Sequence, residues 1–125
     1  MGAEVSPQRY LADSAGAAEA IEEFLVVVRD LGADPTEAEL TSAAPALEAP
    51  LGRARAISER LQSASLDDSR LERQREQSAE ALGEVVRHMQ RFATAAGLGK
   101  RRLIALASRD LSNELADLRR AAEIE

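Results

Sequence analysis

The sequence predicts an all-α protein, an up-down-up-down antiparallel four-helix bundle with long helices. Four segments repeat apolar residues at alternating steps of three and four, as in a coiled coil, which places one apolar residue per turn on a single face. Ala, Leu and Arg, all strong helix formers, are abundant. Only a few residues connect the segments, so consecutive helices must run in opposite directions.

The first helix should begin at Ser6-Pro7, because serine caps free backbone N–H groups and proline fits the first helical position. It should end at Gly32. We expect residues 1–5 to be disordered or a cloning remnant. The apolar stripe of this helix is wider than a two-position seam, and surplus apolar surface often marks an interface. Its three rows are Leu11, Ala18 and Leu25; Tyr10, Ala17, Phe24 and Leu31; and Ile21 and Val28.

The second helix should open at Asp34-Pro35-Thr36-Glu37, with Asp34 as the cap and Glu37 three residues later. Its apolar register continues from Leu40 to Leu61. Pro45 and Pro50 interrupt it, and each removes a backbone hydrogen bond and kinks or breaks a helix. Because the register survives both prolines, we favour a bent helix; a short helix followed by a longer one from about residue 46 is the alternative.

The third helix should start near Asp67-Asp68, whose carboxylates suit a helix N-terminus, and end at Gly97–Gly99. Arg75 and Ser78 occupy inward positions of its stripe, so we expect that end of the bundle to be wet. The fourth helix should run from about Lys100 to Glu123. The inward residues of these two helices are Leu71, Leu82, Val85, Met89, Phe92 and Ala96, then Ile104, Ala107, Leu111, Leu115 and Leu118.

Length and charge restrict the functional classes. The 125 residues suit one helical-bundle domain, residues 1–125. Residues 1–52 hold ten acidic groups and two Arg, a balance of −8, whereas residues 53–125 balance at +2. An acidic protein of net charge −6 is a poor nonspecific ligand for nucleic acid, so we expect no nucleic-acid partner.

The chain contains no cysteine and no apolar run long enough for a transmembrane segment, and its start does not resemble a signal peptide. We therefore expect a cytoplasmic protein, with a trimmed exported protein as the alternative. Fifteen Arg against one Lys, with abundant Ala, indicate a GC-rich genome, most simply a bacterial one.

Groups for catalysis or metal binding are sparse. His88 is the single histidine, four residues after Glu84, whereas di-iron bundles need Glu-x-x-His on two helices. We therefore expect a surface histidine beside the stripe, no metal site and no cofactor. Glu72, Glu76, Glu80 and Glu84 drift around the helix and predict a solvated face. Without an assembled nucleophile and base, the protein is expected not to be an enzyme.

One basic cluster is a candidate contact for an anion or a partner. Lys100, Arg101 and Arg102 follow Gly97-Leu98-Gly99 at the start of the fourth helix, and free N–H groups at such a terminus bind phosphate or carboxylate. The phosphate-loop pattern is absent. The alternative is an ordinary helix cap and loop with solvated charges.

The sequence thus favours a non-enzymatic bundle that acts through protein–protein interaction, as an adaptor, scaffold or accessory subunit. Either the acidic side of the first two helices meets a basic partner, or the wide apolar stripe is shared between chains, as in a homodimer. The alternative is a sensor or carrier domain that binds an anionic or lipid-like small molecule between the helices, where Arg75 and Ser78 would contact the ligand.

Overall fold

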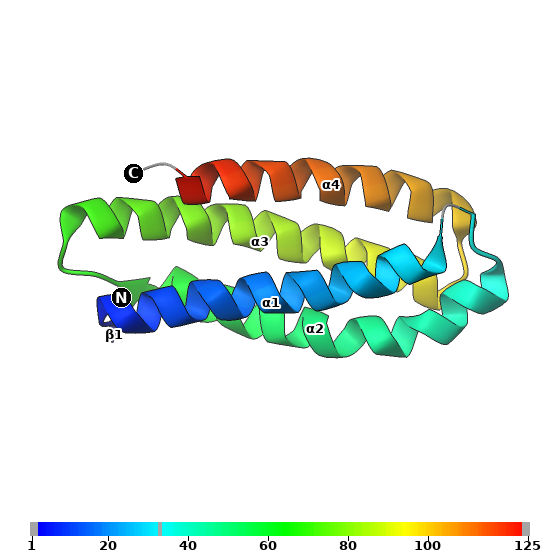
Figure 1. The fold of residues 1–125 in the computed structure, drawn as a ribbon, viewed down its shortest axis with the longest axis horizontal. Helices are drawn as coiled ribbons and strands as arrows, with labels where there is room; N and C mark the ends of the chain where they lie inside the picture. The colour runs from blue at the N-terminus through cyan, green and yellow to red at the C-terminus, as the bar shows by residue number, and fades with distance from the viewer. Residues whose placement is uncertain (1–2, 33, 124–125) are drawn as a thin grey trace.

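A computed structural model describes residues 3–32 and 34–123 of the chain and shows four long helices side by side (Figure 1). They are α1 (Pro7–Leu31), α2 (Glu37–Ser63), α3 (Ser69–Gly97) and α4 (Arg101–Glu123). Each helix runs antiparallel to the one before it. The predicted up-down-up-down four-helix bundle is therefore confirmed.

The helix ends follow local capping chemistry. The side chain of Ser6 accepts a hydrogen bond from the Arg9 N–H at 3.1 Å, and Asp68 accepts from the N–H groups of Arg70 and Leu71, as the sequence predicted for α1 and α3. The predicted N-cap of α2 was wrong by two residues. Its cap is Thr36 rather than Asp34, because Thr36 and Glu39 form a reciprocal capping box that satisfies two backbone N–H groups.

The two prolines of α2 leave the helix unbroken. Pro45 and Pro50 both lie inside the single helix Glu37–Ser63, so the alternative of two separate helices is excluded. Figure 1 shows α2 bowed along its length. A bend is the usual response to a missing hydrogen bond and to the proline ring inside a helix.

The start of the chain is tied to the α2–α3 connection. β1 (Ala3–Glu4) pairs in parallel with β2 (Ala64–Ser65), and the Val5 N–H donates to the Ser65 carbonyl at 2.9 Å. The expectation that residues 1–5 are disordered is therefore wrong for residues 3–5, because the backbone at Ala64–Ser65 offers them a pairing edge. Residues 1–2 lie outside the described part of the chain.

One apolar core runs along the bundle, with Phe24 of α1 meeting Phe92 of α3 edge-to-face at a centroid distance of 5.9 Å. The packing is sequential: α1 lies on α2, α2 on α3, and α3 on α4. By contrast, α1 and α4 do not form a packed pair among the described residues, and α3 is seen between them in Figure 1. The bundle is thus open along one side.

None of the four described helices combines the length and the apolar character needed to cross a bilayer.

Candidate functional site

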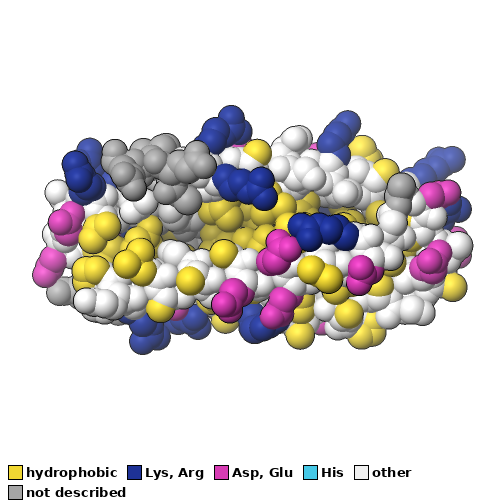
Figure 2. Space-filling view, in the orientation of Figure 1, with side chains coloured by type: hydrophobic (Ala, Val, Ile, Leu, Met, Phe, Trp, Pro, Cys, Tyr) yellow, Lys and Arg dark blue, Asp and Glu magenta, His cyan; other side chains and the backbone are white. Residues whose placement is uncertain are grey.

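A groove lies along the open side of the bundle, between α1 and α4. Its volume is about 460 Å³, and Figure 2 shows apolar side chains at the bottom of the hollow. All four helices contribute to it. The residues that line it are Tyr10, Leu11, Ser14, Ala17, Ala18, Ile21, Glu22, Leu25, Leu61, Gln74, Ser78, Leu82, Leu115, Leu118 and Arg119.

The groove exposes part of the wide stripe predicted for α1. The row Leu11, Ala18 and Leu25 lines it, and Leu11 is 63% exposed. In the neighbouring row, Tyr10, Ala17 and Phe24 are buried and Leu31 is partly buried. An apolar row left open between two helices that do not pack on each other is the kind of surface that binds a partner or a ligand.

The polar groups of the groove lie among these apolar residues. Ser14 and Ser78 contribute hydroxyl groups, and Ser78 is only 9% exposed. Glu22 on α1 and Arg119 on α4 are exposed and of opposite charge. Ser78, one of the predicted ligand contacts, is therefore part of this groove.

Arg75, the other predicted ligand contact, is not among the groove residues. It is 6% exposed, and its guanidinium donates to Glu72 through Nε at 2.8 Å and Nη2 at 2.6 Å, and to the Leu61 carbonyl through Nη1 at 2.5 Å. The carboxylate of Glu72 also accepts from the Leu66 N–H at 2.9 Å. Arg75 thus links α3 to the C-terminal end of α2 through the hydrogen bond to Leu61.

The hydrogen bonds from Arg75 hold the pKa of the Glu72 carboxyl at about 2, well below its usual value, although partial burial acts in the opposite direction. The same bonds raise the pKa of Arg75. At this end of the bundle, which was expected to be wet, the charge of Arg75 is neutralised by Glu72. A ligand carboxylate at Arg75 would have to displace Glu72.

The basic cluster at the start of α4 is opposed by acidic groups from the α1–α2 connection and from α2. Arg101 forms an ion pair with Asp34, and Glu37 lines the same surface hollow as Lys100, Arg101 and Arg102. The pairing reduces the positive charge that the cluster offers to an anion. Gly99 adopts a φ of +67°, as a helix-ending glycine does. The anion or partner contact at Lys100–Arg102 stays a prediction.

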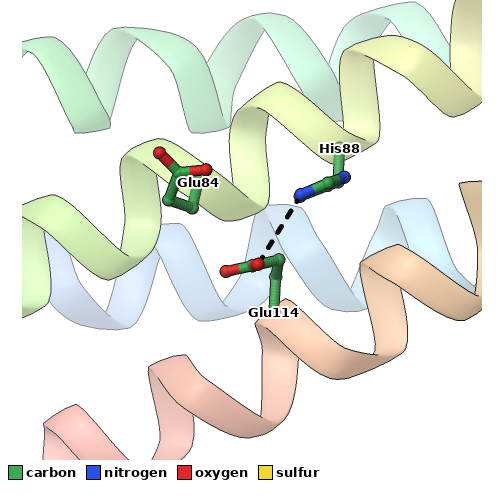
Figure 3. Close-up of side chains that lie close together, drawn as sticks. All are labelled: Glu84, His88 and Glu114. Atoms are coloured by element: carbon green, nitrogen blue, oxygen red, sulfur yellow. Dashed lines mark ion pairs between the residues drawn. The ribbon is translucent and has the colours of Figure 1, made fainter.

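His88 was expected on the surface, and this expectation is wrong. The residue is only 9% exposed, because it lies in the contact between α3 and α4. Glu84 from α3 and Glu114 from α4 lie beside it (Figure 3), and one ligand atom from each of the three residues is within 4.8 Å of the others. Sequence reasoning named Glu84 and His88 but missed Glu114.

The acidic side predicted for the first two helices is partly neutralised. Glu23 of α1 pairs with Arg53 of α2, Glu22 pairs with Arg29, and Asp13 accepts from Arg60 at 3.2 Å. The Glu23–Arg53 and Glu22–Arg29 pairs are exposed, and such pairs contribute at most about 1 kcal/mol each. They leave less free negative charge on this side than the composition suggests.

Comparisons with known proteins show no relationship: no family model, no curated protein and no solved structure matches this chain. Two features of the structure are candidate sites, the groove between α1 and α4 and the cluster around His88.

Proposed function

We propose that this protein is a non-enzymatic helical bundle that binds an amphipathic helix of another protein in the groove between α1 and α4. It would serve as an adaptor, scaffold or accessory subunit. The observation that carries the proposal is the open side of the bundle, where an apolar groove takes the place of direct packing between the first and last helices.

The dimensions of the groove suit a helix. Its α1 wall extends from Tyr10 to Leu25, about 22 Å at 1.5 Å per residue, which is about four helical turns. An amphipathic helix presents one apolar side chain per turn or so along one face, and such helices bind in hydrophobic grooves. A guest helix there would contact both α1 and α4 and close the bundle.

The shape of the groove favours a different protein over a second copy. A two-fold dimer places the same surface against itself, so the surface must be self-complementary. A concave groove needs a convex guest instead. The charge of Arg119 on α4, at the edge of the groove, favours a guest helix with an acidic residue toward α4.

The test blocks the groove without touching the core. Ala18 is exposed and lines the groove, whereas Ala15 is exposed on the same helix and does not line it. Ala18→Glu should therefore place a charge in the groove, and Ala15→Glu is the matched control. A photo-crosslinking amino acid at Leu11 would first trap the partner in the native cells, and its affinity for each purified variant would then be measured.

We expect Ala18→Glu to weaken partner binding at least tenfold and Ala15→Glu to leave it unchanged. Equal affinities for both variants would refute the groove as the binding site. A dimeric mass in light scattering that Ala18→Glu converts to a monomer would identify a second copy of this chain as the guest.

A second candidate function is the binding of a small anionic or lipid-like molecule. The volume of about 460 Å³ falls within the range of small-molecule sites, roughly 300–1,000 Å³, and the lining combines apolar side chains with a few hydroxyl groups and Arg119. A long-chain fatty acid suits this lining, with its tail along the apolar row and its carboxylate at Arg119.

The thermal midpoint of unfolding separates the two functions, because a ligand that binds only the native state raises it. Oleate should raise the midpoint of the wild type and of Ala15→Glu, but not that of Ala18→Glu. If oleate has no effect on the wild type at concentrations below its micelle formation, the carrier function with this ligand class is refuted.

A further inference from the structure

We propose that Glu84, His88 and Glu114 form a binding site for a divalent transition metal ion of the zinc type. The site lies between α3 and α4 and shares no residue with the groove. The proposal therefore does not rest on the partner-binding function proposed above.

The distances in the cluster suit a shared ion better than a hydrogen bond. The His88 Nε2 atom lies 3.6 Å from Glu114 Oε1, which is longer than a hydrogen bond between these atoms. Two donors that each bind one Zn²⁺ at about 2.1 Å lie about 3.4 Å apart at the tetrahedral angle. All three donor atoms are within 4.8 Å of one another, so small side-chain rotations bring them to one ion.

The positions of His88 and Glu114 point to a ligand. Ile104, Ala107 and Leu111 are buried core residues of α4, and Leu118 packs against the same core. The steps from 111 to 114 to 118 place Glu114 in the same row. His88 meets it from α3 and is itself nine-tenths buried. A polar pair between packed helices costs free energy unless its groups find partners.

Hydrogen bonds within the described residues do not satisfy His88. Its buried Nδ1 atom has no hydrogen-bond partner among them, and its Nε2 atom points at Glu114 from beyond hydrogen-bond distance. Figure 3 shows the ring and the Glu114 side chain extending toward each other from the two helices. Nε2, the nitrogen that faces Glu114, is therefore the one that would bind the ion, and the ion would be its partner in place of a hydrogen bond to Glu114.

The donor set selects the type of ion. One imidazole nitrogen and two carboxylates suit zinc and its neighbours, whereas Ca²⁺ and Mg²⁺ prefer sites made of oxygen alone. Three protein ligands leave one tetrahedral position for water. The Glu84 and Glu114 side chains are 39% and 25% exposed, so solvent and the ion can reach the site.

One cation competes for the site. The Arg87 guanidinium lies 3.3 Å from Glu84 Oε1, and its own side chain is 61% exposed. Such an exposed pair contributes little, so an ion can displace it. Arg87→Gln should release Glu84 and remove a nearby positive charge, and we expect this variant to bind zinc at least as tightly as the wild type.

The test uses the untagged full-length protein, stripped with a chelator and titrated with Zn²⁺ by calorimetry. We expect one Zn²⁺ per chain, a higher thermal midpoint with zinc but not with Mg²⁺, and the visible absorption of four-coordinate Co²⁺ when cobalt replaces zinc. His88→Gln and Glu114→Gln should each weaken zinc binding at least tenfold. Glu80→Gln, an exposed glutamate one turn before Glu84, is the matched control and should have no effect.

Two further outcomes decide the proposal. If the wild type binds no zinc at micromolar concentrations, or if both ligand variants bind it as the wild type does, the site is refuted. The double variant His88→Leu with Glu114→Leu completes the apolar row between the helices and should fold. We expect its metal-free form to have a higher thermal midpoint than the wild type and to gain nothing from zinc.

Discussion

Glu72→Gln tests whether Arg75 is a structural clamp. The substitution removes the charge that neutralises a guanidinium only 6% exposed, while Arg75 stays in place. Removing one partner of a fully buried ion pair costs about 3–5 kcal/mol. Because the Glu72 side chain is 25% exposed, we expect a smaller loss, about 2–3 kcal/mol of the free energy of unfolding at pH 7.

The lowered pKa of Glu72 makes the same interaction depend on pH. Folding lowers this pKa from 4.5 to about 2, which corresponds to an upper limit of about 3 kcal/mol. Since the folded pKa lies below the unfolded one, the stabilisation is fully present above about pH 4.5. It is lost as the pH falls from there toward 2.

Urea unfolding of the wild type and of Glu72→Gln at several pH values between 2 and 7 measures both effects. The difference between the two proteins should be greatest at neutral pH and nearly vanish near pH 2. Glu76→Gln is the matched control: its carboxylate lies 3.9 Å from Arg75 and is 64% exposed, so the cost should stay below about 0.5 kcal/mol. A difference between the wild type and Glu72→Gln that does not change with pH would contradict the reasoning.

Two other predictions concern the helices themselves. Thr36→Ala should lower the free energy of unfolding by about 1 kcal/mol, because it removes the cap of α2, whereas Thr36→Ser should keep most of the stability of the wild type. Chemical denaturation measures both variants, and equal stabilities of Thr36→Ala and the wild type would contradict the capping box. In native-state hydrogen exchange, residues 112–120 of α4 should exchange before residues 79–96 of α3, because α3 is the one helix against which α4 packs extensively in the described part of the chain. Equal protection would contradict this.

The helices were predictable from the sequence because their signals are local. The spacing of apolar residues, the caps at Ser6 and Asp68, and Gly32 and Gly99 each act within one or two turns. The N-cap of α2 was misplaced because the sequence offers two candidates, Asp34 and Thr36, and each precedes a glutamate by three residues. The structure shows that the Thr36–Glu39 pair is the one that forms.

The groove could not be predicted, because no local signal says whether the first and last helices of a bundle meet. The width of the α1 stripe did indicate surplus apolar surface, and Leu11, Ala18 and Leu25 are the residues of that stripe that line the groove.

The position of Glu114 in the metal cluster, in contrast, could have been predicted from the sequence. It stands four residues before Leu118 and three after Leu111, on a step where the apolar repeat expects an apolar residue.

The two proposed sites are connected through the way α4 is held. In the described part of the chain, this helix packs mainly on α3, and Leu111 is its last buried apolar residue. After Leu111, Glu114 points toward His88, whereas Leu115 and Leu118 pack partly against the core and line the groove. A metal ion would hold this part of α4 to α3, and a guest helix would hold it to α1. Because both would restrain the same segment, each should favour the conformation that the other binds, and the coupling must be reciprocal.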